Sequence, residues 1–265
     1  MPEGATPPRS VPPEFSFEKE LITAGEMEEL KSEKKIPTRY RTLFWRADLS
    51  PATQELIKDW ARWRIYPITL KDNRRTLHDH RDRLMRDIRE AGRLVKTDPQ
   101  LVRRFREALL KEVQARAVEL LAPDMNFHVR LQGVLILGGL TLMEEDSSNN
   151  IREEAYTPAA EPLRTVITDP NPHEAFQGLK IAACRGLTRI LLIGTLRSDA
   201  QKTQIARDLI AQLNDPSSHV WYQSRLCETL GAINLEISAD NRREPLILDS
   251  LSRVAADKQR DLCVR

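Results

Sequence analysis

The sequence predicts an all-α protein, an α-solenoid of stacked helix pairs, and three observations support that prediction. Apolar residues recur at helical spacing along most of the chain. Glycine makes up only 10 of the 265 residues, roughly half its usual ~7%, which argues against a β-sandwich or barrel built on glycine turns. Beyond residue 123 a helix-pair pattern recurs every 46–47 residues, as in repeat proteins.

Composition and targeting signals exclude several classes of protein. Apolar residues are 40% of the chain and charged residues 30%, as in folded rather than disordered proteins. No apolar run approaches the roughly 18 residues of a membrane span, and we see no signal peptide, so we expect a cytoplasmic protein with no membrane partner. Cys184, Cys227 and Cys263 form no Cys-x-x-Cys pair, which predicts buried, unpaired thiols.

The N-terminal third divides into a tail and a helical region. Residues 1–14 hold five prolines and almost nothing apolar, which predicts a disordered tail. Residues 15–100 are expected to be a helical N-terminal region, either a cap or degenerate repeats. We expect it to open with a short helix near residues 18–33. An irregular stretch anchored by aromatic residues such as Phe44 and Trp45 should follow.

Three further helices are predicted before residue 123. Ser50-Pro51 provides an N-cap followed by proline at the first helical position, and that helix should end near residue 66. The next should begin at residue 69 or 72 and end near residue 95, and Asp98-Pro99 opens the third. Trp60 and Trp63 lie three residues apart on one helical face, which predicts that both belong to the core.

After Pro123 the chain becomes less charged and repeats. Three segments align with steps of 47 and 46 residues, each preceded by a second amphipathic helix, at 101–121, about 158–168 and 199–213; another such helix follows at 244–256. Apolar residues occupy the same position in all three segments at four places, which we call columns and write with one residue number per segment. These columns are 129/176/222, 134/181/227, 137/184/230 and 140/187/233. One helix pair cannot bury both of its faces, so neighbouring pairs must stack.

The first of these segments resembles the second helix of a HEAT repeat. That family's pattern is an Asp/Asn turn, Val-Arg, a small residue, then Leu-Gly and an aliphatic residue. The matching residues are Asp124, Asn126, Val129, Arg130, Gly133, Leu137, Gly138 and Leu140. The second segment keeps Asp169 but carries Phe176-Gln177 in place of Val-Arg. The third keeps Leu230-Gly231 but carries Tyr222-Gln223 there. The resemblance implies a HEAT-like array over residues 101–265.

The array is expected to be incomplete at its C-terminal end. The helix at 244–256 carries Leu246, Ile247, Leu251 and Val254 on one face, and a covering helix would begin near Asp261. Solenoids normally end in a capping helix with a polar outer face. We therefore expect these aliphatic side chains to stay exposed, and expect more chain or a partner to cover them.

The sequence offers no catalytic, cofactor or metal site that we can assign. Gly-x-Ser-x-Gly, a glycine-rich phosphate loop, His-Glu-x-x-His and Cys-x-x-Cys are all missing. His173-Glu174 is a single His-Glu pair, whereas the HEAT-like di-iron hydroxylases use several. We expect His173 and His219 to bond their preceding loops, and His78-Asp79-His80 to lie on a solvated helix face.

The segment 61–116 is the candidate basic surface. It holds 16 Lys/Arg and 8 Asp/Glu, a net charge of +8. Its candidate residues are Arg74, Arg75, Arg81, Arg83, Arg86, Arg89, Arg93, Arg103 and Arg104. HEAT-like DNA glycosylases use concave basic helical surfaces. Within a solvated helix, however, pairs such as Asp79–Arg83, Asp82–Arg86 and Glu90–Arg93 would neutralise much of this charge.

The function that we expect is non-catalytic protein–protein interaction, with the array as a scaffold for protein partners. The first alternative is nucleic-acid binding through segment 61–116. The second is a HEAT-like enzyme of the lyase or metal-dependent hydroxylase type. No cofactor is expected.

Overall fold

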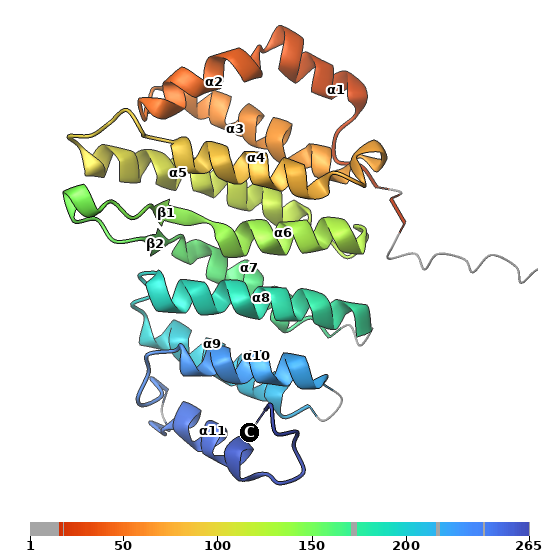
Figure 1. Cartoon of the computed structure of the whole chain (residues 1–265), viewed down its shortest axis with the longest axis vertical. Helices are drawn as coiled ribbons and strands as arrows, with labels where there is room; N and C mark the ends of the chain where they lie inside the picture. The colour runs from red at the N-terminus through yellow and green to blue at the C-terminus, as the bar shows by residue number, and fades with distance from the viewer. Residues whose placement is uncertain (1–15, 18, 171–173, 216–217, 241, 265) are drawn as a thin grey trace, which may run out of the picture.

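The computed structural model describes residues 16–17, 19–170, 174–215, 218–240 and 242–264. The predicted tail, residues 1–14, lies outside the described residues. The described chain is mostly helical, with its helices stacked along the long axis of the molecule (Figure 1). The all-α fold class is therefore confirmed.

The helices are α1 Ala24–Glu28, α2 Ile36–Trp45, α3 Pro51–Ile65, α4 Leu77–Glu90, α5 Pro99–Glu119, α6 Phe127–Gly139, α7 Ala160–Ile167, α8 Glu174–Ile193, α9 Asp199–Leu213, α10 Val220–Gly231 and α11 Leu246–Ala256. A π-helical turn, Glu29–Glu33, follows α1 directly. Short 3₁₀ segments are Tyr66–Thr69, Lys71–Asn73, Ser147–Asn149 and Thr157–Ala159. Strands β1 Thr141–Met143 and β2 Glu154–Ala155 pair antiparallel, with Thr141 opposite Ala155.

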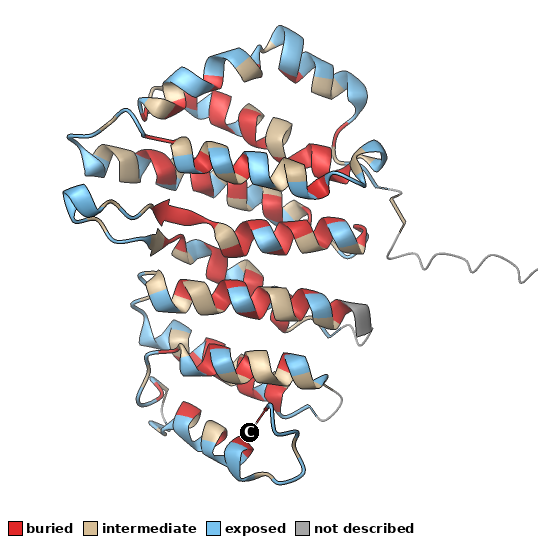
Figure 2. Cartoon of the chain, viewed as in Figure 1, coloured by how far each residue is buried: buried red, intermediate tan, exposed pale blue. Residues whose placement is uncertain are grey.

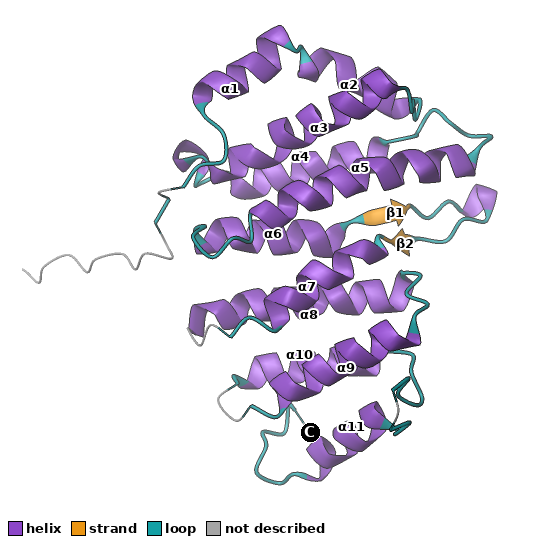
Figure 3. Cartoon of the chain, turned by 180° about the vertical axis from the view of Figure 1, so that it is seen from behind, coloured by secondary structure: helices purple, strands orange, loops and turns teal. Residues whose placement is uncertain are grey.

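The helices form two layers. One layer holds α4, α6, α8 and α10 side by side, and the other holds α3, α5, α7 and α9 behind them (Figures 1 and 3). Consecutive helices pair across the layers, α5 with α6, α7 with α8 and α9 with α10. The α3–α4 pair has the same arrangement, and it packs on the α5–α6 pair. The buried residues lie mainly between the layers (Figure 2).

Helix starts follow the local sequence. The Ser50 side chain accepts a hydrogen bond from the Thr53 backbone N–H, and Asp98 does the same for Leu101, each followed by proline at the first helical position. Asn126 caps α6 by accepting from the His128 N–H. These caps satisfy backbone donors that have no partner within the helix, which is why both serine- and aspartate-proline starts were predictable.

Three of the four predicted apolar columns are buried throughout. These are Val129/Phe176/Tyr222, Leu137/Cys184/Leu230 and Leu140/Leu187/Ile233. In the remaining column Val134 is buried, whereas Ile181 and Cys227 are only half-buried. The registers of 47 and 46 residues therefore place equivalent side chains in equivalent surroundings.

Hydrogen bonds connect α6 and α8 to the loop between the two helices of the next pair, and α10 to the segment that follows α11. Arg130 Nη2 lies 3.1 Å from Asp169 Oδ2. Gln177 Oε1 accepts from the His219 N–H at 2.8 Å. Gln223 Oε1 accepts from Arg260 Nη1 at 3.0 Å. Positions 130, 177 and 223 are equivalent in the repeat, so the three contacts form one series, which we call the loop ladder.

Helices α6 and α8 approach each other through two glycines. A Cβ atom placed on Gly138 would lie 2.8 Å from the Gly186 Cα, and one on Gly186 would lie 2.7 Å from the Gly138 Cα. Real Cβ atoms do not come so close to backbone, since no side-chain rotation can relieve the contact. Both positions therefore need glycine for the two helices to pack at this distance.

Several predictions about the N-terminal region were wrong. The stretch expected to be irregular contains α2, because Pro37 lies in its first turn, where the missing N–H costs no helical hydrogen bond. The predicted helix near 18–33 begins only at Ala24, where Thr23 and Glu26 form a capping box. Helix α4 runs from Leu77 to Glu90 rather than from residue 69 or 72 to about 95, because 3₁₀ turns occupy 66–69 and 71–73 before it and Ala91 is extended after it.

The C-terminal end differs from the prediction as well. On α11, Ile247 and Val254 are buried, and only Leu246 and Leu251 of the predicted set are half-buried. Residues 257–264 turn back without starting an α-helix near Asp261. Arg260 Nη1 donates to the Leu213 carbonyl at 3.1 Å. That the array continues beyond residue 265 stays a prediction.

Candidate functional site

The nine candidate arginines lie at several different places. Arg74 and Arg75 are exposed just before α4, and Arg104 is exposed on α5. Arg81 lies toward α6, where its Nη1 donates to Gln132 Oε1 at 3.1 Å. Arg103 makes a two-pronged ion pair with Glu154 of β2, at 2.6 and 2.8 Å. Arg89 and Arg93 lie near the end of α4, at a cleft beside the β-hairpin.

Two of the three predicted neutralising pairs on α4 do not form. The described side chains place Asp79 beside His78, at 3.4 Å, and Asp82 beside Arg81, at 2.9 Å. Only Glu90–Arg93 pairs as expected, at 3.7 Å. Among the described residues, the side chains of Arg83 and Arg86 therefore make neither an ion pair nor a hydrogen bond.

Arg83 and Arg86 line a groove between α2, α3 and α4, which we call the Arg–Trp groove. It encloses about 530 Å³. Its lining residues are Pro37, Tyr40, Arg41, Trp45, Trp63, Arg64, Arg83, Arg86, Asp87, Glu90 and Arg93. Five arginines against two carboxylates give the lining a formal charge of +3.

Both carboxylates of the Arg–Trp groove already have partners. Asp87 Oδ2 accepts from Arg64 Nε at 2.7 Å. Burial raises the pKa of Asp87, and Arg64 opposes that shift. Glu90 Oε2 accepts from the Trp45 indole N–H at 3.2 Å.

The indole rings hold two of the guanidinium groups. Arg64 lies over the Trp63 ring, 4.0 Å from its centroid, and Arg93 lies 3.7 Å over Trp45. Cation–π contacts of this kind fix the plane of a guanidinium while leaving its N–H edge available. Trp60 is fully buried as predicted, but Trp63 is half-buried on the groove, so its assignment to the core was wrong.

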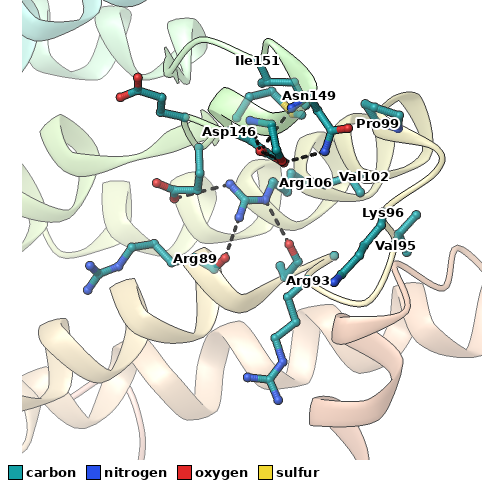
Figure 4. A pocket seen from close by; sticks show the side chains of 16 residues that line it. Arg89, Arg93, Val95, Lys96, Pro99, Val102, Arg106, Asp146, Asn149 and Ile151 are labelled. Atoms are coloured by element: carbon teal, nitrogen blue, oxygen red, sulfur yellow. Dashed lines mark hydrogen bonds and ion pairs between the residues drawn. The ribbon is translucent and has the colours of Figure 1, made fainter.

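The cleft beside the β-hairpin is built around Arg106 (Figure 4). It encloses about 440 Å³. The Arg106 side chain is 4% exposed, and burial lowers the pKa of its guanidinium. Its Nη2 donates to the Arg89 carbonyl at 2.7 Å, and its Nε donates to the Ala91 carbonyl at 3.2 Å. Its Nη1 lies 3.5 Å from the Leu142 carbonyl.

Arg106 therefore joins the end of α4 to the hairpin, and its donors face backbone carbonyls and the Glu144 carboxylate, whose Oε1 lies 3.5 Å from Nη1. The cleft walls carry both charges, with Arg89, Arg93 and Lys96 on one side and Asp146 on the other. Asp146 in turn accepts from the backbone N–H groups of residues 148 and 149, at 3.0 and 3.3 Å. The polar groups at this cleft thus hold its own loops in place.

The α4–α6–α8–α10 layer exposes a second surface, away from the other layer. We call it the outer face; its residues are His128, Leu131 and Leu135 on α6, Gly178, Ala182 and Arg185 on α8, and Trp221, Ser224 and Glu228 on α10. Leu135 is 37% exposed and Trp221 is 69% exposed. The repeat register aligns these positions across the helices, as in 131/178/224 and 135/182/228.

The histidines do not come together. His219 is the N-cap of α10, and its Nδ1 accepts from the Trp221 N–H at 3.2 Å rather than bonding the preceding loop. His173 lies outside the described residues. His78 is exposed as predicted, but Asp79 and His80 are half-buried, so the prediction of a solvated face holds only in part. Burial lowers the pKa of His80. Across the described residues no three His, Cys, Asp or Glu side chains gather where they could hold a metal ion.

The cysteines differ in exposure, so the prediction that all three are buried is confirmed for Cys184, holds only in part for Cys227 and was wrong for Cys263. Cys184 is buried, Cys227 half-buried and Cys263 exposed. Burial raises the pKa of Cys184 to about 12. Hydrogen bonding with Asp261 also raises the pKa of Cys263, but the Cys263 thiol is exposed. The thiolate is the nucleophile and must be reached by the reagent, so we expect a maleimide at pH 7.5 to label Cys263 first and Cys184 only on unfolding.

The labelled sites can be read by peptide mass spectrometry. A Cys263→Ser variant is the control, since it should lose the fast phase and keep the protection of Cys184. Rapid labelling of Cys184 in the folded protein would show that the 137/184/230 column is not buried.

Sequence reasoning missed the Arg–Trp groove because its residues come from three helices between positions 37 and 93. The available signal was Trp63-Arg64, where a tryptophan adjoins an arginine in the sequence. None of the helices in the described ranges is both long enough and apolar enough to cross a lipid bilayer. Comparison with known proteins adds no family, since no protein-family model, no curated protein and no solved structure matches this chain.

Proposed function

We propose that this chain is a HEAT-like α-solenoid that acts as a non-catalytic scaffold for a protein partner. Three features support the repeat assignment: the stacked helix pairs, the buried columns at steps of 46–47 residues, and the loop ladder. The Arg130–Asp169 pair joins the Val-Arg position of one repeat to the Asp position of the next. Stacked repeats of this kind offer extended surfaces for binding.

The observation that carries the binding proposal is the outer face. Leu131, Leu135 and Trp221 are at least partly open to solvent there, and small residues at 178 and 182 lie between them. Small side chains between large apolar ones leave room for a partner's side chains to pack. Exposed tryptophan is also among the residues that contribute most to protein–protein affinity.

The test compares acidic substitutions on and off the outer face. The partner is the protein that cross-links to the wild-type chain. We expect the double variant Leu135→Asp/Trp221→Asp to recover at least about tenfold less of this partner than the wild type does. Leu94→Asp is the matched control, because Leu94 is 55% exposed but lies outside the outer face. Cross-linking mass spectrometry measures both the recovery and the residues that are joined.

Circular dichroism should show that all three chains are folded to the same extent. Equal recovery of the partner by the double variant and the wild type would contradict the proposal. Cross-links confined to residues outside the outer face would also contradict it.

A further inference from the structure

The Arg–Trp groove has the size of a small-molecule site and an excess of positive charge. Its volume of about 530 Å³ falls within the ~300–1,000 Å³ that is typical of ligand pockets. Three helices wall it, so a ligand inside would lose part of its contact with water. A groove of this shape strengthens electrostatic contacts, because water that would screen them is displaced.

Three guanidinium groups at the groove have no carboxylate partner among the described residues. Arg41 makes one side-chain hydrogen bond, from its Nε to the Tyr40 hydroxyl at 3.3 Å, which leaves its two terminal nitrogens free. Arg83 and Arg86 have no side-chain partner, as described above. They lie three residues apart on α4, so they are neighbours on one helical face.

Such a cluster of cations repels itself unless an anion lies between them. Like charges at this helical spacing are destabilising, and Asp87 and Glu90 are already paired with Arg64 and Trp45. The remaining +3 of the lining is therefore free to attract an anion. A single carboxylate would leave most of it uncompensated, whereas a ligand with two or more phosphate groups would neutralise it.

The identity of the cations points to phosphate in particular. All five are arginine and none is lysine. The planar guanidinium donates two parallel hydrogen bonds to phosphate oxygens, which an ammonium group cannot do. Arg93 is additionally held in plane by Trp45, so part of the entropy cost of binding is already met before a ligand arrives.

We propose that the Arg–Trp groove binds a small molecule that carries two or more phosphate groups. Arg41, Arg83 and Arg86 would contact the phosphates, with Arg93 at the rim. A nucleic-acid strand fits the observations less well, because Arg74, Arg75 and Arg104 lie outside the groove and do not extend it into a track. The site is separate from the outer face and independent of the scaffold proposal.

The test uses inorganic tripolyphosphate as the probe, with isothermal titration calorimetry in 0.15 M salt. We expect binding with the wild-type chain and a loss of at least about tenfold in affinity for Arg83→Ala/Arg86→Ala, since each charge-assisted hydrogen bond contributes on the order of tenfold. Arg74→Ala/Arg75→Ala removes the same charge from exposed positions outside the groove. It should change the affinity less than about twofold, because surface charges are largely screened at this salt.

Further measurements separate the effect of charge from that of guanidinium geometry, and a nucleotide from other polyphosphates. Arg83→Lys/Arg86→Lys keeps the charge but removes the planar guanidinium groups that donate two parallel hydrogen bonds. This variant should bind tripolyphosphate more weakly than the wild type and more tightly than the alanine variant. ATP and inositol hexakisphosphate in place of tripolyphosphate distinguish a nucleotide from another polyphosphate. Leu135→Asp/Trp221→Asp should bind tripolyphosphate normally, which keeps this result independent of the partner experiment.

Three outcomes would overturn the proposal. The first is no heat of binding with any of the three polyphosphates. The second is an equal loss in the Arg74/Arg75 control, which would indicate general attraction to a basic surface. The third is binding of a single-stranded oligonucleotide through Arg83 and Arg86 when all three small polyphosphates fail to bind.

Discussion

Replacing Gly138 with alanine is expected to destabilise the protein, although alanine normally favours a helix. The new Cβ would meet the Gly186 backbone at 2.8 Å, so α6 and α8 would have to move apart. Overpacking of this kind costs about 1–3 kcal/mol, whereas an open helical site gains up to about 1 kcal/mol from the same change. Urea denaturation followed by circular dichroism measures the difference in the free energy of unfolding.

Gly231→Ala is the matched control for that experiment. Gly231 follows Leu230 as Gly138 follows Leu137, but nothing lies within 4 Å of a Cβ placed there. We expect this variant to be at least as stable as the wild type. If Gly138→Ala matched it, the close approach of α6 and α8 would not exist in solution.

Replacing Arg106 with methionine should give the second large loss of stability. The change leaves the carbonyls of Arg89 and Ala91 without their donor, and a buried acceptor without a partner costs about 1–3 kcal/mol. We expect the free energy of unfolding to fall by about 2–4 kcal/mol in total. Hydrogen exchange should also increase at the end of α4 and in the hairpin, which Arg106 connects.

Arg104→Met tests whether this loss depends on the buried position. Arg104 lies on the same helix two residues away but is exposed, so its removal should change stability by no more than about 0.5 kcal/mol. Equal effects of the two substitutions would mean that Arg106 is not buried against those carbonyls.

The helix starts and most of the buried apolar positions were predictable because their signals are local or periodic. Ser50-Pro51 and Asp98-Pro99 cap helices through contacts within a few residues. The columns 137/184/230 and 140/187/233 come from spacing alone, and both are buried. The hairpin was missed because Thr141–Met143 continues the apolar run of α6, and a short apolar run does not distinguish a strand from a helix.

The Arg–Trp groove could not be predicted for a different reason. Its charge balance depends on which carboxylates pair with which cations across helices. Asp79 and Asp82 were expected to neutralise Arg83 and Arg86, but they pair with the neighbouring residues 78 and 81 instead. Helical spacing shows which side chains are within reach of one another. Packing against α2 and α3 decides which of these partners each carboxylate and each guanidinium binds.

The loop ladder has a mechanical consequence. Positions 130, 177 and 223 each connect one helix pair only to the next, so a load along the long axis passes from pair to pair through these contacts together with the packed helix faces. A small change in each contact would then add up over the length of the molecule, as in a coil spring, without any single hinge. The first contact is an ion pair, and the last two are hydrogen bonds to a neutral glutamine oxygen. We therefore expect the connection between α6 and α8 to resist stretching more than the connection between α10 and the segment after α11.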